Sequence, residues 1–185
     1  MSPRLLLAAT LSLFAAGPGF AQSPAPVMTE SGLVRGAAEP GLTVYKGIPF
    51  AAPPVGDLRW RAPQPPQPWT DVLDATSFGP VSPQPRSPIP MGLGTRADED
   101  CLFLNIWAPS GSSAGGARPV MVWLHGGAYI FGSGSQPLYD GSVLAASCDV
   151  VVVTLNYVCL FLINDKVVCQ SYSEFNHCSI HLVVI

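Results

Sequence analysis

The order of apolar and polar positions along the chain predicts a series of short strands and one short helix. Residues 150–155 form a continuous, largely β-branched apolar stretch, which is typical of a strand buried on both faces. Residues 120–124 are apolar throughout and predict a second buried strand, so we expect both to be central strands of one sheet. Short antiparallel strands are predicted at residues 32–36 and 42–46, a further strand at 102–107, and a short helix at 141–146.

Composition indicates a globular domain, and the order of the predicted strands and helix indicates the start of an α/β sheet. The 185 residues are enough for one domain with a hydrophobic core, and 48% hydrophobic against 11% charged residues excludes a disordered polar chain. The 20 prolines and 18 glycines indicate many turns and long loops, and residues 51–90 are largely irregular. A net charge of −3 without a block of basic residues argues against nucleic acid and anionic membranes as partners.

The N-terminus has the features of a secretory signal peptide. Arg4 precedes an apolar run over residues 5–16, and small residues lead to a cleavage site after Ala21. The run is shorter than the roughly 20 residues that span a bilayer, so cleavage and export are favoured over a membrane anchor. We therefore expect residues 1–21 to be removed and the mature protein to be secreted or periplasmic.

Composition changes abruptly near residue 157. Residues 158–185 contain no Ala, Gly, Pro or Arg and hold three of the five cysteines, Cys159, Cys169 and Cys178. The first part is rich in residues with GC-rich codons and the tail in residues with AT-rich codons. A frameshift, intron read-through or gene-model error would produce this change, and a natural terminal segment of unusual composition is the alternative. The expected organisation is a signal peptide (1–21), a coherent domain portion (22–157) and an unrelated tail (158–185).

The segment with the clearest chemical meaning follows the apolar run at residues 120–124. His125-Gly126-Gly127-Ala128 forms a turn in which glycine, having no Cβ, lets the backbone approach a ligand closely. Backbone N–H groups that converge in such a turn stabilise a developing negative charge, as in the oxyanion holes of lipases and esterases.

A series of motifs in the same order as in one known family covers nearly all of residues 27–157. The motifs include Lys46-Gly47-Ile48-Pro49-Phe50, Leu58-Arg59-Trp60, Phe78-Gly79-Pro80, Glu99-Asp100-Cys101-Leu102, His125-Gly126-Gly127-Ala128 and Val153-Thr154-Leu155-Asn156-Tyr157. Together they strongly resemble the type-B carboxylesterases, the cholinesterase-like branch of the α/β-hydrolases. The resemblance stops after Tyr157, where this family usually continues with Arg-Leu-Gly.

The resemblance implies an incomplete α/β-hydrolase fold and a role for each matching residue. Gly127 and Ala128 match the N–H donors of the oxyanion hole, and Gly126 shapes the loop. The third donor, the nucleophile elbow and the Ser-Glu/Asp-His triad have no matching positions in this chain. The family needs no metal or organic cofactor, and its substrates are small carboxylic esters.

Two structural features of the family also map onto this chain. Arg59 and Glu99 match an ion pair, which contributes little to stability if both charges are solvated and much more if they are buried. Cys101 matches the second cysteine of a family disulfide, whose first cysteine is replaced here by Ser82. The resemblance therefore implies a buried thiol at Cys101, and the pairing of Cys148 and the three tail cysteines stays open.

Three other motifs are weaker candidates for chemistry. Ser113 lies in Gly111-Ser112-Ser113-Ala114-Gly115, but this match precedes the oxyanion loop and lacks the strand and helix of a nucleophile elbow. His125 belongs to the oxyanion-loop motif, so a structural or substrate-facing role is favoured over that of a general base. His177 and His181 lie near Cys169 and Cys178, but the spacing does not match a zinc site, so no metal ligands are expected.

These features predict a truncated carboxylic ester hydrolase that is inactive as this chain because the triad is missing. A non-catalytic, cholinesterase-like binding or adhesion module is the first alternative. A small exported metal-binding protein built around the Cys/His tail is the second. The ester substrate and the oligomeric state are left open by the sequence.

Overall fold

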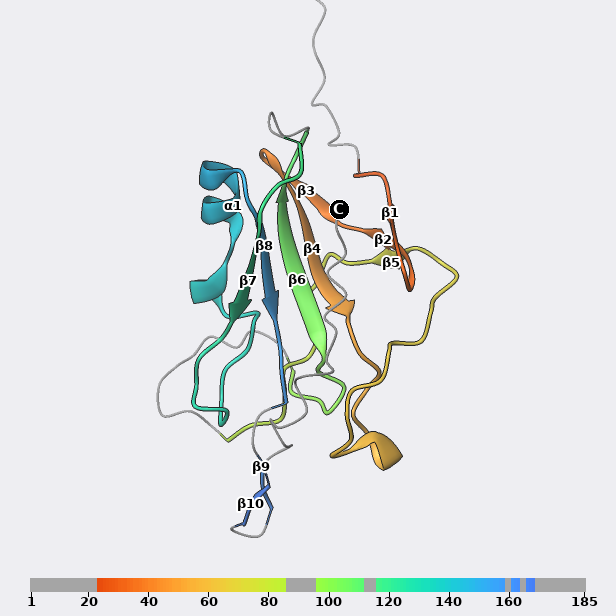
Figure 1. The fold of residues 1–185 in the computed structure, drawn as a ribbon, viewed down its shortest axis with the longest axis vertical. Coiled ribbons are helices and arrows are strands. Elements are labelled where there is room, and N and C mark those ends of the chain that lie inside the picture. The colour runs from red at the N-terminus through yellow and green to blue at the C-terminus, as the bar shows by residue number, and fades with distance from the viewer. Residues whose placement is uncertain (1–22, 86–95, 112–115, 159–160, 164–165, 169–185) are drawn as a thin grey trace, which may run out of the picture.

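The computed structural model describes residues 23–85, 96–111, 116–158, 161–163 and 166–168, and its centre is a five-stranded mixed sheet (Figure 1). The strand order is β3-β4-β6-β8-β7. The strands are β3 (Ala37–Glu39), β4 (Leu42–Pro49), β6 (Phe103–Pro109), β8 (Val151–Leu155) and β7 (Val120–Leu124). All neighbours are antiparallel except β7 and β8, which are parallel.

The parallel pair is connected by a helical crossover, as two parallel strands require. From the end of β7 the chain passes through the 3-10 helix η2 (Pro137–Tyr139) and helix α1 (Ser142–Cys148) before it enters β8. This confirms the helix predicted at residues 141–146, displaced by one residue at its start and two at its end. A mixed sheet with a helical crossover is the start of an α/β fold, as the order of the predicted elements indicates.

Two smaller sheets complete the described structure. Strands β1 (Val27–Thr29), β2 (Gly32–Arg35) and β5 (Leu73–Asp74) form one, and β9 (Phe161–Ile163) and β10 (Lys166–Val168) form an antiparallel pair. The strands predicted at 32–36 and 42–46 both form. They lie in different sheets, however, because β2 pairs with β1 and β5 whereas β4 pairs with β3 and β6. Between β4 and β6 the described residues are mostly irregular outside β5, with a 3-10 helix η1 at Gly56–Leu58.

Apolar side chains cover both faces of the central sheet. On one face Trp107, Val44 and Val152 pack with Ala145 of α1, and on the other Tyr45, Ile106 and Val153 pack with residues of β2 and the chain after β5. Gly141 begins α1 close against Trp107 and Val152, where a Cβ would lie 2.8 Å from a methyl group of Val152. The prediction that residues 150–155 are buried on both faces is confirmed for residues 152–155, which are all buried, whereas residues 150 and 151 are half-buried.

The strand predicted at residues 120–124, expected to be central in a larger sheet, is uncovered in the part of the chain that the structure describes. The strand forms with those bounds, but β7 is the outermost strand of the sheet, and its five side chains are between 37% and 55% exposed. Helix α1 packs on β4, β6 and β8, and no described strand lies along the outer edge of β7.

Among the helices of the described residues, none has the length and hydrophobicity needed to cross a membrane.

Candidate functional site

The loop after β7 adopts a rare left-handed backbone at the positions that the sequence singles out. Gly127 has φ +122°, and the next two residues, Ala128 and Tyr129, have φ +53° and +60°. Residues other than glycine seldom adopt positive φ, and such strain is found mainly at functional sites. The backbone N–H groups of Gly127 and Ala128 have no hydrogen-bond acceptor among the described residues.

A tight turn within the loop depends on Gly127. Its carbonyl oxygen accepts hydrogen bonds from the N–H groups of Ile130 at 2.9 Å and Phe131 at 3.2 Å. A Cβ at this position would lie 1.8 Å from the Phe131 carbonyl oxygen, so the turn has no space for a larger residue. Gly126 differs, because a Cβ there would meet nothing within 4 Å and its φ is not positive. The turn geometry thus requires glycine at 127 and not at 126.

His125 holds the start of the loop against the end of β8. Its ring stacks on Tyr157 with centroids 4.1 Å apart and planes 9° apart, and the Tyr157 hydroxyl donates to the His125 carbonyl oxygen at 2.7 Å. The His125 Nδ1 lies 2.8 Å from the Gly126 carbonyl oxygen, which can only accept, so Nδ1 carries the proton. The Nε2 atom is buried without a partner among the described residues, and no carboxylate is described beside it. This environment fits a structural role better than that of a general base.

Burial lowers the pKa of His125, and the hydrogen bond to Gly126 offsets only part of that effect. Since the pKa is lower in the folded state than the ordinary value of about 6.5, the unfolded chain binds more protons below that pH. We therefore expect the free energy of unfolding to fall as the pH falls below about 6.5. Urea unfolding at pH 8.0 and 5.5 measures this, with His125→Gln as control. An equal pH dependence in His125→Gln would contradict the assignment.

A buried polar network holds the return of the loop onto the sheet. The Gly132 N–H donates to Gln84 Oε1 at 2.7 Å, and Gln84 Nε2 donates to the carbonyl oxygens of Gly132 and Ser82. Two residues later the Gly134 N–H donates to Asn156 Oδ1 at 2.8 Å, and its carbonyl oxygen accepts from Thr154 Oγ1 at 2.7 Å. The segment after the loop at residues 126–131 is therefore fixed on both sides by side-chain hydrogen bonds.

Asn156 is the centre of this network, and the sequence analysis assigned it no role. Besides Gly134, it donates through Nδ2 to the carbonyl oxygens of Pro80 at 3.0 Å and Cys101 at 3.1 Å. Asn105 extends the network, donating to Thr154 Oγ1 and accepting from the Gly47 N–H at the irregularity in β4. The only sequence signal was an Asn directly after a strand of β-branched residues, which does not identify its partners.

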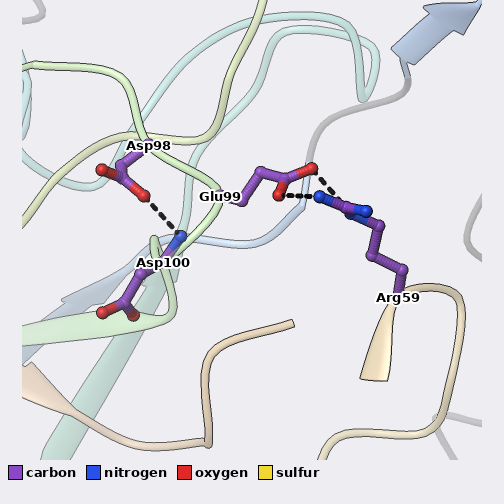
Figure 2. A network of polar contacts seen from close by, with 4 residues as sticks. All are labelled: Arg59, Asp98, Glu99 and Asp100. Atoms are coloured by element: carbon purple, nitrogen blue, oxygen red, sulfur yellow. Dashed lines mark hydrogen bonds and ion pairs between the residues drawn. The ribbon is translucent and has the colours of Figure 1, made fainter. Parts of the chain in front are cut away.

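Arg59 and Glu99 lie beside this region and face each other in a bidentate pair (Figure 2). Arg59 Nε is 2.9 Å from Glu99 Oε1, and Nη2 is 2.5 Å from Oε2. Hydrogen bonding to Arg59 lowers the pKa of Glu99 and raises that of Arg59. Both side chains are nearly half exposed, at 49% and 45%. The two charges are therefore solvated, and we expect the pair to contribute little to stability. Figure 2 also shows the Asp98 carboxylate accepting from the Asp100 N–H at 3.1 Å.

We expect Glu99→Gln to leave the urea midpoint almost unchanged, because solvent screens the exposed charges. Arg118 is the comparison, because its side chain is only 16% exposed and bonds both Asp149 at 2.7 Å and the Gly111 carbonyl oxygen at 3.0 Å. Arg118→Met should lower the midpoint more than Glu99→Gln. The reverse order would show that the Arg59–Glu99 pair holds the Pro-rich loop.

The remaining candidate residues fall into two groups. Cys101 is a buried thiol that packs with Ala51 and Leu102, and Ser82 is also buried. Ser113, the signal peptide, and the group Cys169, His177, Cys178 and His181 lie outside the described residues. Within the described part of the chain no three His, Cys, Asp or Glu side chains are grouped to hold a metal ion.

Comparison with known proteins gives consistent results over the same part of the chain. The profile of the Carboxylesterase family matches residues 23–159. The chain is 52% identical over 133 residues to para-nitrobenzyl esterase of Bacillus subtilis (strain 168), covering 71% of this chain and 27% of that protein. It is 48% identical over 135 residues to phenmedipham hydrolase of Pseudarthrobacter oxydans, covering 70% and 27%. A solved structure of PNB esterase superposes with a TM-score of 0.69 at 51% identity, covering 73% of this chain and 28% of that one. The chain thus spans little more than a quarter of the length of these relatives.

Proposed function

Since the chain belongs to the carboxylesterase family, we propose that it is the N-terminal part of an enzyme that hydrolyses carboxylic esters. Its described sheet is an incomplete α/β-hydrolase fold, like the corresponding part of the esterases to which it is similar. In this proposal the loop at Gly126, Gly127 and Ala128 supplies part of the oxyanion hole. One observation carries the proposal: the left-handed turn leaves the N–H groups of Gly127 and Ala128 without acceptors in the described structure.

The chemistry of ester hydrolysis explains what such a loop contributes. When a serine hydroxyl attacks the carbonyl carbon, the C–O double bond becomes single and negative charge develops on that oxygen. Two N–H groups already fixed in position stabilise this charge without reorganising, and one such donor is typically worth about 10²–10³ in kcat. His125 and the network around Asn156 hold the loop in position and do not touch the reacting atoms.

The 185-residue chain is proposed to be inactive by itself, because no residue in it matches the nucleophile, base or acid of the family. We expect the purified chain to release p-nitrophenol from short p-nitrophenyl esters no faster than denatured protein does. A fluorophosphonate probe should not label it. Steady turnover that disappears in Ser113→Ala would show instead that Ser113 is a nucleophile.

A chimera tests the positive part of the proposal. Residues 27–157 of this chain replace the matching segment of para-nitrobenzyl esterase, to which they are about half identical. We expect the chimera to hydrolyse p-nitrophenyl esters, because the esterase portion supplies the triad and this chain supplies the loop. A folded chimera that binds the fluorophosphonate probe but does not turn over would favour the non-catalytic binding module.

Export is a separate part of the proposal and rests on the pattern at residues 1–21 alone. Expression in a bacterium with a functional secretion pathway should give a mature protein that begins at Gln22. Intact-mass measurement detects this, and Leu7→Arg within the apolar run should abolish cleavage. A protein that keeps residues 1–21 in both forms would exclude export.

A further inference from the structure

The direction of the Gly127 N–H depends on the peptide that joins Gly126 to Gly127. A peptide bond is planar and this one is trans, so the Gly126 carbonyl and the Gly127 N–H lie in one plane and point in opposite directions. A contact that fixes the carbonyl oxygen therefore also fixes the N–H. The His125 Nδ1, 2.8 Å from this oxygen, makes that contact. Donation to the carbonyl also polarises the peptide, which makes its N–H a stronger donor.

The Ala128 N–H is held in a different way. It belongs to the next peptide, whose carbonyl is that of Gly127, and this oxygen accepts from the N–H groups of Ile130 and Phe131 within the turn. The turn itself therefore orients the Ala128 N–H, whereas the ring of His125 orients the Gly127 N–H. The two donors of the proposed oxyanion hole thus depend on different contacts.

The backbone of Gly132 lies directly against the hydrogen bond between His125 and Gly126. A Cβ at Gly132 would lie 2.5 Å from His125 Nδ1 and 2.7 Å from the Gly126 carbonyl oxygen, which are the two atoms of that bond. Gly132 also has φ +116°, a conformation that favours glycine. Because both atoms of the bond touch the Gly132 backbone, a displacement of Gly132 would disturb it.

Gln84 fixes the Gly132 backbone from a segment 48 residues away in the chain. Its Oε1 accepts from the Gly132 N–H at 2.7 Å, and its Nε2 donates to the Gly132 carbonyl oxygen at 3.0 Å. One side-chain amide thus bonds both polar groups of the same residue. Nε2 also donates to the Ser82 carbonyl oxygen at 2.9 Å, which fixes the rotation of the amide. These three bonds oppose both translation and rotation of the Gly132 backbone.

We propose that Gln84 is a positioning residue for the oxyanion hole, an inference that rests on the proposed function. By fixing Gly132, Gln84 preserves the hydrogen bond from His125 Nδ1 to the carbonyl oxygen of the following residue. That bond aims the Gly127 N–H at the oxygen on which negative charge develops. Without Gln84 the Gly127 N–H loses its fixed direction, whereas the turn still holds the Ala128 N–H. The oxyanion hole then keeps one oriented donor of the two that this chain supplies.

The para-nitrobenzyl esterase chimera with Gln84→Met tests the proposal, because methionine keeps the length of the side chain and removes all three hydrogen bonds. We expect kcat for p-nitrophenyl esters to fall by about tenfold, less than the roughly 10²–10³-fold that the loss of a donor costs, with a much smaller change in KM. Gln84→Glu is the second variant, since its carboxylate accepts from the Gly132 N–H but cannot donate to the carbonyl oxygens. It should lower kcat in the same way.

Gln64→Met is the matched control, because it makes the same substitution at an exposed amide with one bond, to the Ala62 carbonyl oxygen. It should leave kcat unchanged. A trifluoromethyl ketone adds a readout of the oxyanion hole, since the serine forms with it a tetrahedral adduct that carries negative charge on oxygen. Its inhibition constant should rise by about tenfold in Gln84→Met. Partial unfolding would not produce this rise, because an inhibition constant does not depend on the amount of active enzyme.

The link from Gln84 to His125 can also be measured in the 185-residue chain, without catalysis. In NMR spectra of the chain with ¹⁵N-labelled histidine, the His125 Nδ1–H should give a slowly exchanging signal that is absent in His125→Gln. This signal should broaden in Gln84→Met and persist in Gln64→Met. A signal that stays unchanged in Gln84→Met would overturn the inference.

The outcomes in the chimera separate this inference from the proposed function. If both Gln84 variants lowered the thermal unfolding midpoint but left kcat and the inhibition constant unchanged, the inference would be wrong and the proposed function would stand. A loss confined to KM, or an equal loss of kcat in Gln64→Met, would have the same meaning. A folded parent chimera without esterase activity would overturn the proposed function and this inference with it.

Discussion

Replacing Asn156 by Ala is expected to lower the free energy of unfolding by about 3 kcal/mol or more. Its buried amide joins three separate segments, bonding the Gly134 N–H and the carbonyl oxygens of Pro80 and Cys101. The Ala variant leaves the Gly134 N–H and the Pro80 carbonyl oxygen without these bonds, whereas the Cys101 carbonyl oxygen still accepts from the Phe103 N–H at 2.9 Å. Each buried group left unpaired costs about 1–3 kcal/mol. A loss of this size is a large part of the 5–15 kcal/mol that typically stabilises a domain.

Urea unfolding followed by tryptophan fluorescence at low protein concentration measures this loss. Gln64→Ala is the control, because the Gln64 side chain is an exposed amide with one hydrogen bond to the Ala62 carbonyl oxygen. Its midpoint should stay close to that of the unmodified chain. Asn156→Asp distinguishes the hydrogen bond that Asn156 accepts from the two that it donates. The carboxylate can still accept from the Gly134 N–H, but it places negative charge against two carbonyl oxygens. A midpoint for Asn156→Ala equal to that of Gln64→Ala would refute the role assigned to Asn156.

The two strands of the parallel pair show how far a local apolar pattern predicts structure. The stretches at residues 120–124 and 150–155 look alike in sequence, and each forms a strand where the pattern places it. Their burial differs, because β8 has β6 on one side and β7 on the other, whereas β7 has β8 as its one neighbour among the described strands. An apolar pattern indicates a strand whose side chains favour burial. Whether those side chains are buried depends on which strands lie beside it in the sheet.

The small sheet illustrates the same limit in pairing. Residues 32–36 and 42–46 have strand patterns and are close in sequence, which favours a hairpin between them. The chain instead adds β3 as the partner of β4, and β2 pairs with β5 from residues 73–74. A side-chain pattern does not specify which strand supplies the hydrogen bonds, and the short strand β5 carries almost no pattern of its own.

The candidate site could be predicted only where its features are local. The turn at residues 125–128 is a contiguous motif, so sequence reasoning found it and the need for glycine in it. The network that holds the turn joins residues as far as 76 positions apart, such as Pro80 and Asn156. Asn and Thr are common at strand ends and in turns, so their partners emerge only when the sheet brings the segments together.

Gly127→Ala in the para-nitrobenzyl esterase chimera should lower kcat for p-nitrophenyl esters by about 10²-fold, with a smaller change in KM. Gly127 has φ +122°, and an added Cβ would lie 1.8 Å from the Phe131 carbonyl oxygen, so the turn must change shape. That change moves the N–H groups of Gly127 and Ala128 away from the oxygen on which charge develops. The interaction is made in the transition state, so its loss is expected in kcat.

Gly126→Ala is the matched control for this experiment, because it makes the same chemical change one residue earlier. A Cβ there would meet nothing within 4 Å, so the loop should keep its shape and kcat should stay within a few-fold of the parent chimera. The thermal unfolding midpoint of both variants separates loss of the oxyanion hole from loss of folding, since it measures the folded state without a reaction at the serine. If Gly127→Ala and Gly126→Ala had equal kcat, the loop would not be the oxyanion hole. If both variants lost kcat and also had a much lower unfolding midpoint, glycine would serve the folding of the loop at both positions.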